Sequence, residues 1–193
     1  MSLLDEFIEK RGGAADGIVR KAFRSPPSFD KAARSARFCM MSEDVDRYGD
    51  IVRVEGMEID SFLANPVVLP FHMAREVPIG MWEGIEKITR GRPPRMEGTA
   101  VFLPEGELEM ADRVVKGIQH GLLRGASVGF MPVDLKVRRN EDGDFLGFDI
   151  GTAQLFECSI VSIPANPRAL VRDCGDEAVA RRILEETLAD WTR

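Results

Sequence analysis

The sequence predicts a mainly β fold with a few flanking helices, and three observations lead to this class. The middle of the chain is a series of short apolar runs bounded by Gly, Pro, Asn or Asp, as β-strands are. One internal segment and both ends carry apolar residues at helical spacing instead. With 193 residues, the chain can bury the core of one domain. We therefore predict an α+β fold built on a small closed antiparallel β-barrel, in which closure removes exposed edges.

The order of these elements divides the chain into three parts. Residues 1–35 are predicted as an N-terminal arm, with a short amphipathic helix and a Gly- and Pro-rich linker. Residues 36–172 form the barrel domain, and residues 173–193 form a C-terminal amphipathic helix. The predicted strands of the barrel are ARFCMMS, IVRVEGMEI, NPVVLPFH, IGMWEGIEKI, RMEGTAVFL, ASVGFMPVDLKVRR and FLGFDIGTAQLFECSIVSI.

One helix interrupts these strands at residues 107–120. Its apolar residues recur at helical spacing, acidic residues come early, Lys116 comes late, and Gly121 follows as a stop signal. His120 lies in its last turn, where a cationic side chain is favoured by the helix dipole and needs no catalytic role.

Composition and charge exclude several classes of protein. The net charge of −6 disfavours a nucleic-acid partner, and no apolar run is long enough to span a membrane. The N-terminus lacks the features of a secretory signal, so we expect an intracellular protein. The three cysteines, Cys39, Cys158 and Cys174, form no CxxC pair, so neither a disulfide framework nor a zinc site is indicated, and no cofactor is expected.

Three side chains are candidates for chemistry. His72 follows an apolar strand and opens an irregular segment, a position where functional groups are often held. Ser127, in GASVGF, is either a nucleophile or a small residue in a tight corner; a strand follows it, so it is not the GxSxG elbow of α/β-hydrolases. Glu157 lies in an otherwise apolar strand and needs a partner, for which Arg168 or Arg172 would serve in a purely structural ion pair.

Four segments in order carry a family resemblance: DRYGDIV, NPVVLPFH with VPIG, GLLRGASVGFMP, and FECSIVSIPANPRAL. From about Ala36 to Val171 the chain resembles the prohead proteases of tailed bacteriophages, which are similar in fold to the herpesvirus assemblin proteases. The resemblance implies a serine endopeptidase in which Ser127 is the nucleophile, His72 the base and Glu157 the third member. Assemblins use a second histidine in that third role, whereas this chain offers a carboxylate.

The oxyanion of such an enzyme needs hydrogen-bond donors, and we predict them in the PANPR turn, with Asn166 and Arg168 as supporting side chains. The resemblance also implies major capsid and scaffold proteins as substrates, action inside the immature capsid in the cytoplasm of a bacterial host, and self-processing or self-association as further properties to test.

Two alternatives stay open from the sequence alone. A catalytically silent capsid-assembly or scaffold module would keep the fold without the activity. A metal-dependent hydrolase would use His72 with acids such as Asp46, Asp50 or Glu76, although one histidine without an HExxH helix is a poor ligand set, and we predict no metal.

Overall fold

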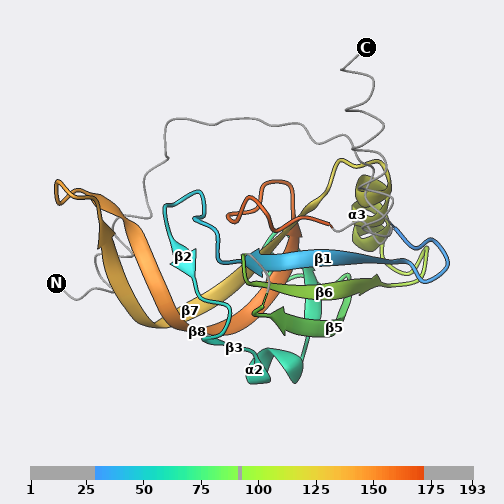
Figure 1. Cartoon of the computed structure of the whole chain (residues 1–193). Coiled ribbons are helices and arrows are strands. Elements are labelled where there is room, and N and C mark those ends of the chain that lie inside the picture. The colour runs from blue at the N-terminus through green and yellow to red at the C-terminus, as the bar shows by residue number, and fades with distance from the viewer. Residues whose placement is uncertain (1–28, 91–92, 172–193) are drawn as a thin grey trace, which may run out of the picture.

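The computed structural model describes residues 29–90 and 93–171, which form a curled, eight-stranded sheet with two helices (Figure 1). The predicted amphipathic helices at the two ends of the chain lie outside these residues. The elements are β1 (Ser35–Ser42), β2 (Ile51–Val52), β3 (Met57–Glu58), α2 (Asp60–Leu63), β4 (Val67–Pro70), β5 (Gly80–Ile88), β6 (Arg95–Phe102), α3 (Glu109–Gln119), β7 (Gly125–Arg139) and β8 (Phe145–Val161).

The sheet is built around its longest strand. In the order β1-β6-β5-β4-β8-β2, neighbouring strands are hydrogen-bonded, and β3 and β7 also pair with β8. β7 lies antiparallel along one side of β8, while the short strands β2, β3 and β4 lie parallel to it along the other side. β8 is therefore the strand on which residues from the two halves of the chain meet.

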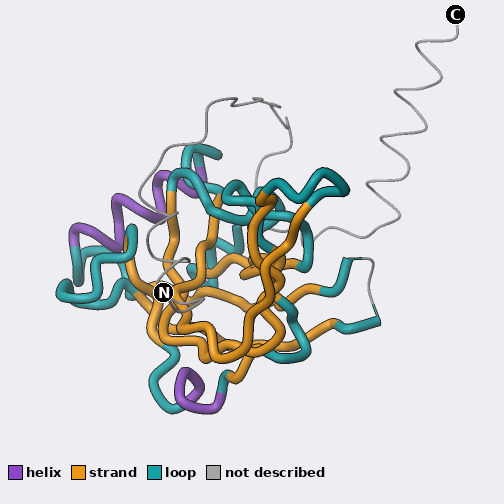
Figure 2. Tube along the Cα trace, turned by 90° about the vertical axis from the view of Figure 1, so that its left-hand side faces the viewer, coloured by secondary structure: helices purple, strands orange, loops and turns teal. Residues whose placement is uncertain are grey.

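The mainly β, α+β prediction is confirmed, but the sheet is open rather than a closed antiparallel barrel. Strands β1 and β7 share no ladder in the described part of the chain; Val171 and Leu170 make only isolated bridges to Phe38 and Gly125. Three pairings are parallel because the chain returns to β8 through connections other than hairpins. In the view of Figure 2 the strands nevertheless curl around a common interior.

The interior is apolar and packs against β8, the central strand of the sheet. α3 buries Ala111, Val114, Val115 and Ile118, the face predicted from its spacing, and His120 is its C-cap. Trp82 of β5 donates its indole N–H to the carbonyl oxygen of Cys158 at 2.9 Å. This buried hydrogen bond links β5 to β8.

Two features of the described residues lie outside the predictions. The short helix α2 was not predicted from the sequence, where its residues follow an apolar run. Phe29, which falls in the predicted arm, stacks on Phe102 with ring centroids 6.3 Å apart. Within residues 29–90 and 93–171 no helix is long and apolar enough to cross a membrane.

Candidate active site

The pairing of β7 with β8 sets the position of Ser127. Ser127 lies opposite Ser159, and Gly129 lies opposite Glu157. Side chains of directly paired residues project from the same face of a sheet, so the two serines share a face. The Ser127 residue is 7 % exposed. The predicted strand that begins at GASVGF is therefore confirmed, and Ser127 pairs with the strand that carries Glu157.

A β-bulge in β8 orients Glu157. Gly129 pairs with Glu157 and the next residue of β7, Phe130, pairs with Leu155, so that Phe156 is the extra residue. Both Leu155 and Cys158 are fully buried although they are three positions apart, which a regular strand does not allow. The bulge leaves Phe156 55 % exposed and turns Glu157 away from the core. Bulges of this kind redirect side chains at functional sites.

Gly129 makes room for the carboxylate of Glu157. A Cβ atom at Gly129 would lie 2.3 Å from Glu157 Oε1 and 3.0 Å from its Cγ. Any larger residue would therefore displace the acidic side chain. The glycine is required here by a close approach, not by its backbone conformation.

His72 lies in a strained turn directly after β4. Phe71 and His72 have φ angles of 51° and 61°, in the left-handed region that costs a non-glycine residue about 1 kcal/mol or more. Two hydrogen bonds hold this turn on β8: Phe71 N–H donates to the carbonyl oxygen of Ile160 at 3.0 Å, and His72 N–H donates to Ser159 Oγ at 3.1 Å. The turn brings the imidazole over the bulged part of β8.

The imidazole of His72 contacts Glu157 directly. Nδ1 of His72 lies 2.7 Å from Oε1 of Glu157, and the two side chains are 46 % and 17 % exposed. The hydrogen bond to Glu157 raises the pKa of His72 above its usual 6.5, burial opposes this, and the charge of Glu157 adds to the rise. An imidazole in this state has Nδ1–H fixed on the acid, which leaves Nε2 as the atom that exchanges a proton.

The purely structural partners considered for Glu157 are not the ones found. Arg168 pairs with Asp44 instead, with Nε 3.1 Å from Oδ2. Arg172 lies outside the described residues. The carboxylate predicted to need a partner is thus satisfied by His72 and by a hydroxyl.

That hydroxyl belongs to Ser159, which is not among the predicted site residues. Ser159 Oγ donates to Glu157 Oε2 at 2.5 Å and accepts the backbone N–H of His72. Ser159 is fully buried. The signal that could have found it is a hydroxyl two residues after the acid, within the apolar run LFECSIV.

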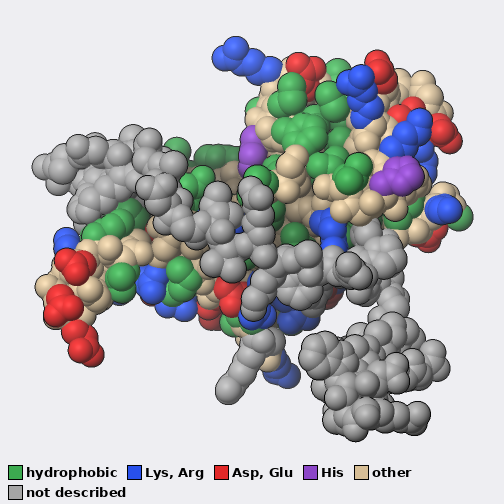
Figure 3. All heavy atoms as spheres, turned by 90° about the horizontal axis from the view of Figure 1, so that it is seen from above, with side chains coloured by type: hydrophobic (Ala, Val, Ile, Leu, Met, Phe, Trp, Pro, Cys, Tyr) green, Lys and Arg blue, Asp and Glu red, His purple; other side chains and the backbone are tan. Residues whose placement is uncertain are grey.

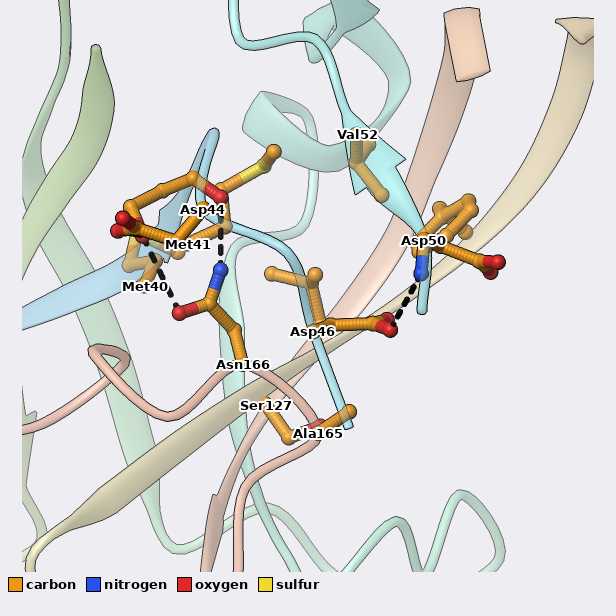
Figure 4. A pocket seen from close by; sticks show the side chains of 12 residues that line it. Met40, Met41, Asp44, Asp46, Asp50, Val52, Ser127, Ala165 and Asn166 are labelled. Atoms are coloured by element: carbon orange, nitrogen blue, oxygen red, sulfur yellow. Dashed lines mark hydrogen bonds between the residues drawn. The ribbon is translucent and has the colours of Figure 1, made fainter. Parts of the chain in front are cut away.

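A cavity opens on the other side of Ser127. It is lined by Ser127 and Val128 of β7, by the end of β1 with the turn that follows it, and by Ala165 and Asn166 (Figure 4). Three carboxylates border it: Asp44, Asp46 and Asp50. Ser127 therefore borders a small, mainly apolar cavity that has carboxylates at its edge.

Asn166 and Arg168 hold the PANPR turn against the end of β1. Asn166 Nδ2 donates to the carbonyl oxygen of Ser42 at 2.7 Å, and its Oδ1 lies 3.1 Å from the Ser42 hydroxyl (Figure 4). The same Oδ1 accepts the N–H of Arg168 at 2.9 Å. These bonds place the turn beside Ser127. The assignment of both side chains to an oxyanion site stays a prediction.

The second histidine lies apart from His72, and two of the acids considered as metal ligands, Asp46 and Asp50, accept backbone N–H groups. In Figure 3 the two histidines of the chain appear as separate purple patches, so His72 and His120 do not share one site. Asp46 Oδ1 accepts the N–H groups of Tyr48 and Asp50, and Asp50 Oδ1 accepts the N–H of Phe148. Among the described residues, no group of three or more His, Cys, Asp or Glu side chains is arranged to hold a metal ion.

Comparison with known protein families gives one match. The model of the caudovirus prohead serine proteases matches residues 103–189, a range that contains Ser127 and Glu157 but not His72. Comparisons with curated proteins and with solved structures gave no match. The resemblance predicted from the sequence motifs is thus confirmed over this range: the chain is similar to the prohead serine proteases of caudoviruses.

Proposed function

We propose that this chain is a serine endopeptidase that cleaves capsid and scaffold proteins during procapsid maturation, with Ser127 as nucleophile, His72 as general base and Glu157 as the acid that orients it. The observation that carries the proposal is the 2.7 Å contact between His72 Nδ1 and Glu157 Oε1, on the strand that also pairs with Ser127. The family match supports the reaction class, because the matched proteins are serine proteases.

The proposed chemistry uses the two ring nitrogens of His72 differently. Glu157 accepts Nδ1–H, and Nε2 takes the proton of the Ser127 hydroxyl as Oγ attacks the carbonyl carbon of the scissile peptide bond. The resulting tetrahedral intermediate collapses when Nε2 returns this proton to the leaving amine, which leaves an acyl-enzyme. Water then attacks the ester by the same route, with its proton passing through Nε2, and Ser127 is restored.

The negative oxygen of the tetrahedral intermediate needs donors that the reaction itself does not supply. We place them in the PANPR turn, which Asn166 and Arg168 fix beside the cavity that Ser127 lines. The proposed site of action is the immature capsid, in the cytoplasm of the bacterial host. Its substrates there are the major capsid protein and the scaffold protein, and the reaction uses no cofactor.

Co-expression of the chain with the capsid and scaffold proteins of its own particle tests the proposal. Mass spectrometry should find new termini in one or both partners, and Ser127→Ala should abolish them. Ser35→Ala, which removes another buried serine hydroxyl at the start of β1, is the matched control and should cleave normally. Intact partners with the unmodified chain, in particles that assemble normally, would favour the silent assembly module instead.

A further inference from the structure

We infer that Ser159 is a positioning residue of this site, which holds both the carboxylate of Glu157 and the backbone of His72 in their reactive arrangement. The inference rests on the proposed function, since it gives Ser159 a role in the same reaction. It goes further, because neither the sequence motifs nor the family match assigns any role to this hydroxyl.

The hydrogen bonds of Ser159 link the carboxylate of Glu157 to the backbone of His72. A hydroxyl has one proton to donate and lone pairs to accept with. Here the proton goes to Glu157 Oε2 at 2.5 Å, and a lone pair receives the N–H of His72 at 3.1 Å. With Oε2 held in this way, Oε1 faces Nδ1 of His72. One buried atom therefore fixes the acid and the residue that carries the base.

The same bonds argue against a role of Ser159 as the nucleophile. Its proton is committed to a carboxylate, and its residue has no exposed surface that a peptide carbonyl could reach. Ser127 lies directly opposite on β7 and borders a cavity. The two serines thus share one face of the sheet with separate roles, one towards the substrate and one towards the acid.

Loss of the Ser159 hydroxyl has a consequence that a merely structural serine would not have. Without its donor on Oε2, the Glu157 carboxylate is free to rotate away from Nδ1, and the N–H of His72 loses its acceptor. Glu157 is the charged group that raises the pKa of His72. Since the base must be neutral to act, the acidic limb of the kcat/KM profile should move to lower pH when Glu157 is released.

Kinetics of Ser159→Ala, Ser159→Thr and Ser35→Ala on a capsid-derived peptide test the inference. Ser159→Ala should lower kcat about 10- to 100-fold, the range for losing one hydrogen bond to a charged group, with little change in KM. Its acidic limb should move to lower pH, and Ser159→Thr, which keeps a hydroxyl, should restore much of both. Ser35→Ala should change neither. If Ser159→Ala has a normal kcat and an unchanged acidic limb of its pH profile, the inference is wrong.

A measurement without turnover separates this inference from the proposed function. The ring nitrogens of His72 can be titrated by ¹⁵N NMR in the full chain and in Ser159→Ala. The titration midpoint should fall towards 6.5 in the variant, and Nδ1–H should no longer dominate the neutral form. If Ser127→Ala still cleaves, the proposed nucleophile is wrong, but the NMR result on Ser159 stands. A His72 titration that is identical with and without the Ser159 hydroxyl removes the positioning role even if Ser127 is the nucleophile.

Discussion

Ser127 lies between two polar clusters that begin with the same local arrangement. On the β8 side, Ser159 donates its hydroxyl to the carboxylate of Glu157, two residues before it. At the end of β1, Ser42 donates its hydroxyl to the carboxylate of Asp44, two residues after it, at 2.7 Å. Both carboxylates are thus held by a nearby serine, and both clusters border the same nucleophile candidate.

The clusters differ in the cation that completes them. Asp44 pairs with Arg168, and a guanidinium is not a proton-transfer group in proteins. Glu157 pairs with His72, which gains and loses a proton near neutral pH. A hydroxyl–carboxylate pair alone therefore says little about chemistry. Its cationic partner decides whether the cluster can only hold a turn or is also able to move a proton.

The largest effect on activity should come from removing His72, the partner of Glu157. His72→Ala should reduce kcat about 10⁵-fold or more, as loss of a base that acts as a unit with its nucleophile does. The assay is cleavage of a capsid-derived peptide, and His120→Ala is the control, since His120 only ends α3. Full activity of His72→Ala would reverse this assignment, as would an inactive but folded His120→Ala.

A smaller loss of activity is expected when Glu157 is replaced by an uncharged residue of the same shape. Glu157→Gln should lower kcat about 10³- to 10⁴-fold, because the amide no longer fixes the Nδ1–H form of His72. Glu157 raises the pKa of His72, so the remaining activity should have its acidic limb at lower pH. A full pH profile of kcat/KM measures both, and a limb that moves to higher pH would contradict the role of Glu157.

Gly129→Ala moves the acid without replacing it. The added methyl group would meet the end of the Glu157 side chain, which can shift, so the strand should still form. A misplacement of about 1 Å in the catalytic geometry costs about 10²-fold in rate, so kcat should fall by about this factor. Steady-state kinetics together with thermal unfolding separate the two effects: a normal kcat would mean that the carboxylate position is not critical, and an unfolded variant would mean that the strand itself needs the glycine.

The smallest effect belongs to the ion pair of Arg168 and Asp44. Arg168 is 64 % exposed, so Arg168→Ala should lower the free energy of unfolding by only about 0.2–1 kcal/mol, as other exposed ion pairs do. Urea denaturation measures this loss. A fall in kcat beyond tenfold at nearly unchanged stability would instead show that Arg168 supports the oxyanion, and the two clusters would then both be part of the catalytic machinery.

The sequence predicted most strands and α3, because each has its own hydrophobic period and end signals. It could not predict that β2, β3 and β4 pair in parallel with β8, since pairing depends on tertiary contacts. His72, Ser127 and Glu157 were candidates from their positions in the sequence and received their roles by resemblance to a family. The contact between His72 and Glu157 bears on two of them. Ser159 and Gly129 were missed because their importance depends on strand register and on one bulge.

The bulge at Phe156 also makes the site sensitive to chain length rather than only to residue type. A deletion of one residue between Leu155 and Cys158 would remove the bulge and leave these two buried residues two positions apart, on one face of a regular strand. The apolar positions of β8 would keep their faces, but the acidic side chain would lose the local direction that the bulge gives it. Single-residue deletions should therefore be tolerated in the turn at residues 140–144, whereas a deletion at residues 155–158 should abolish activity even where the sheet still forms.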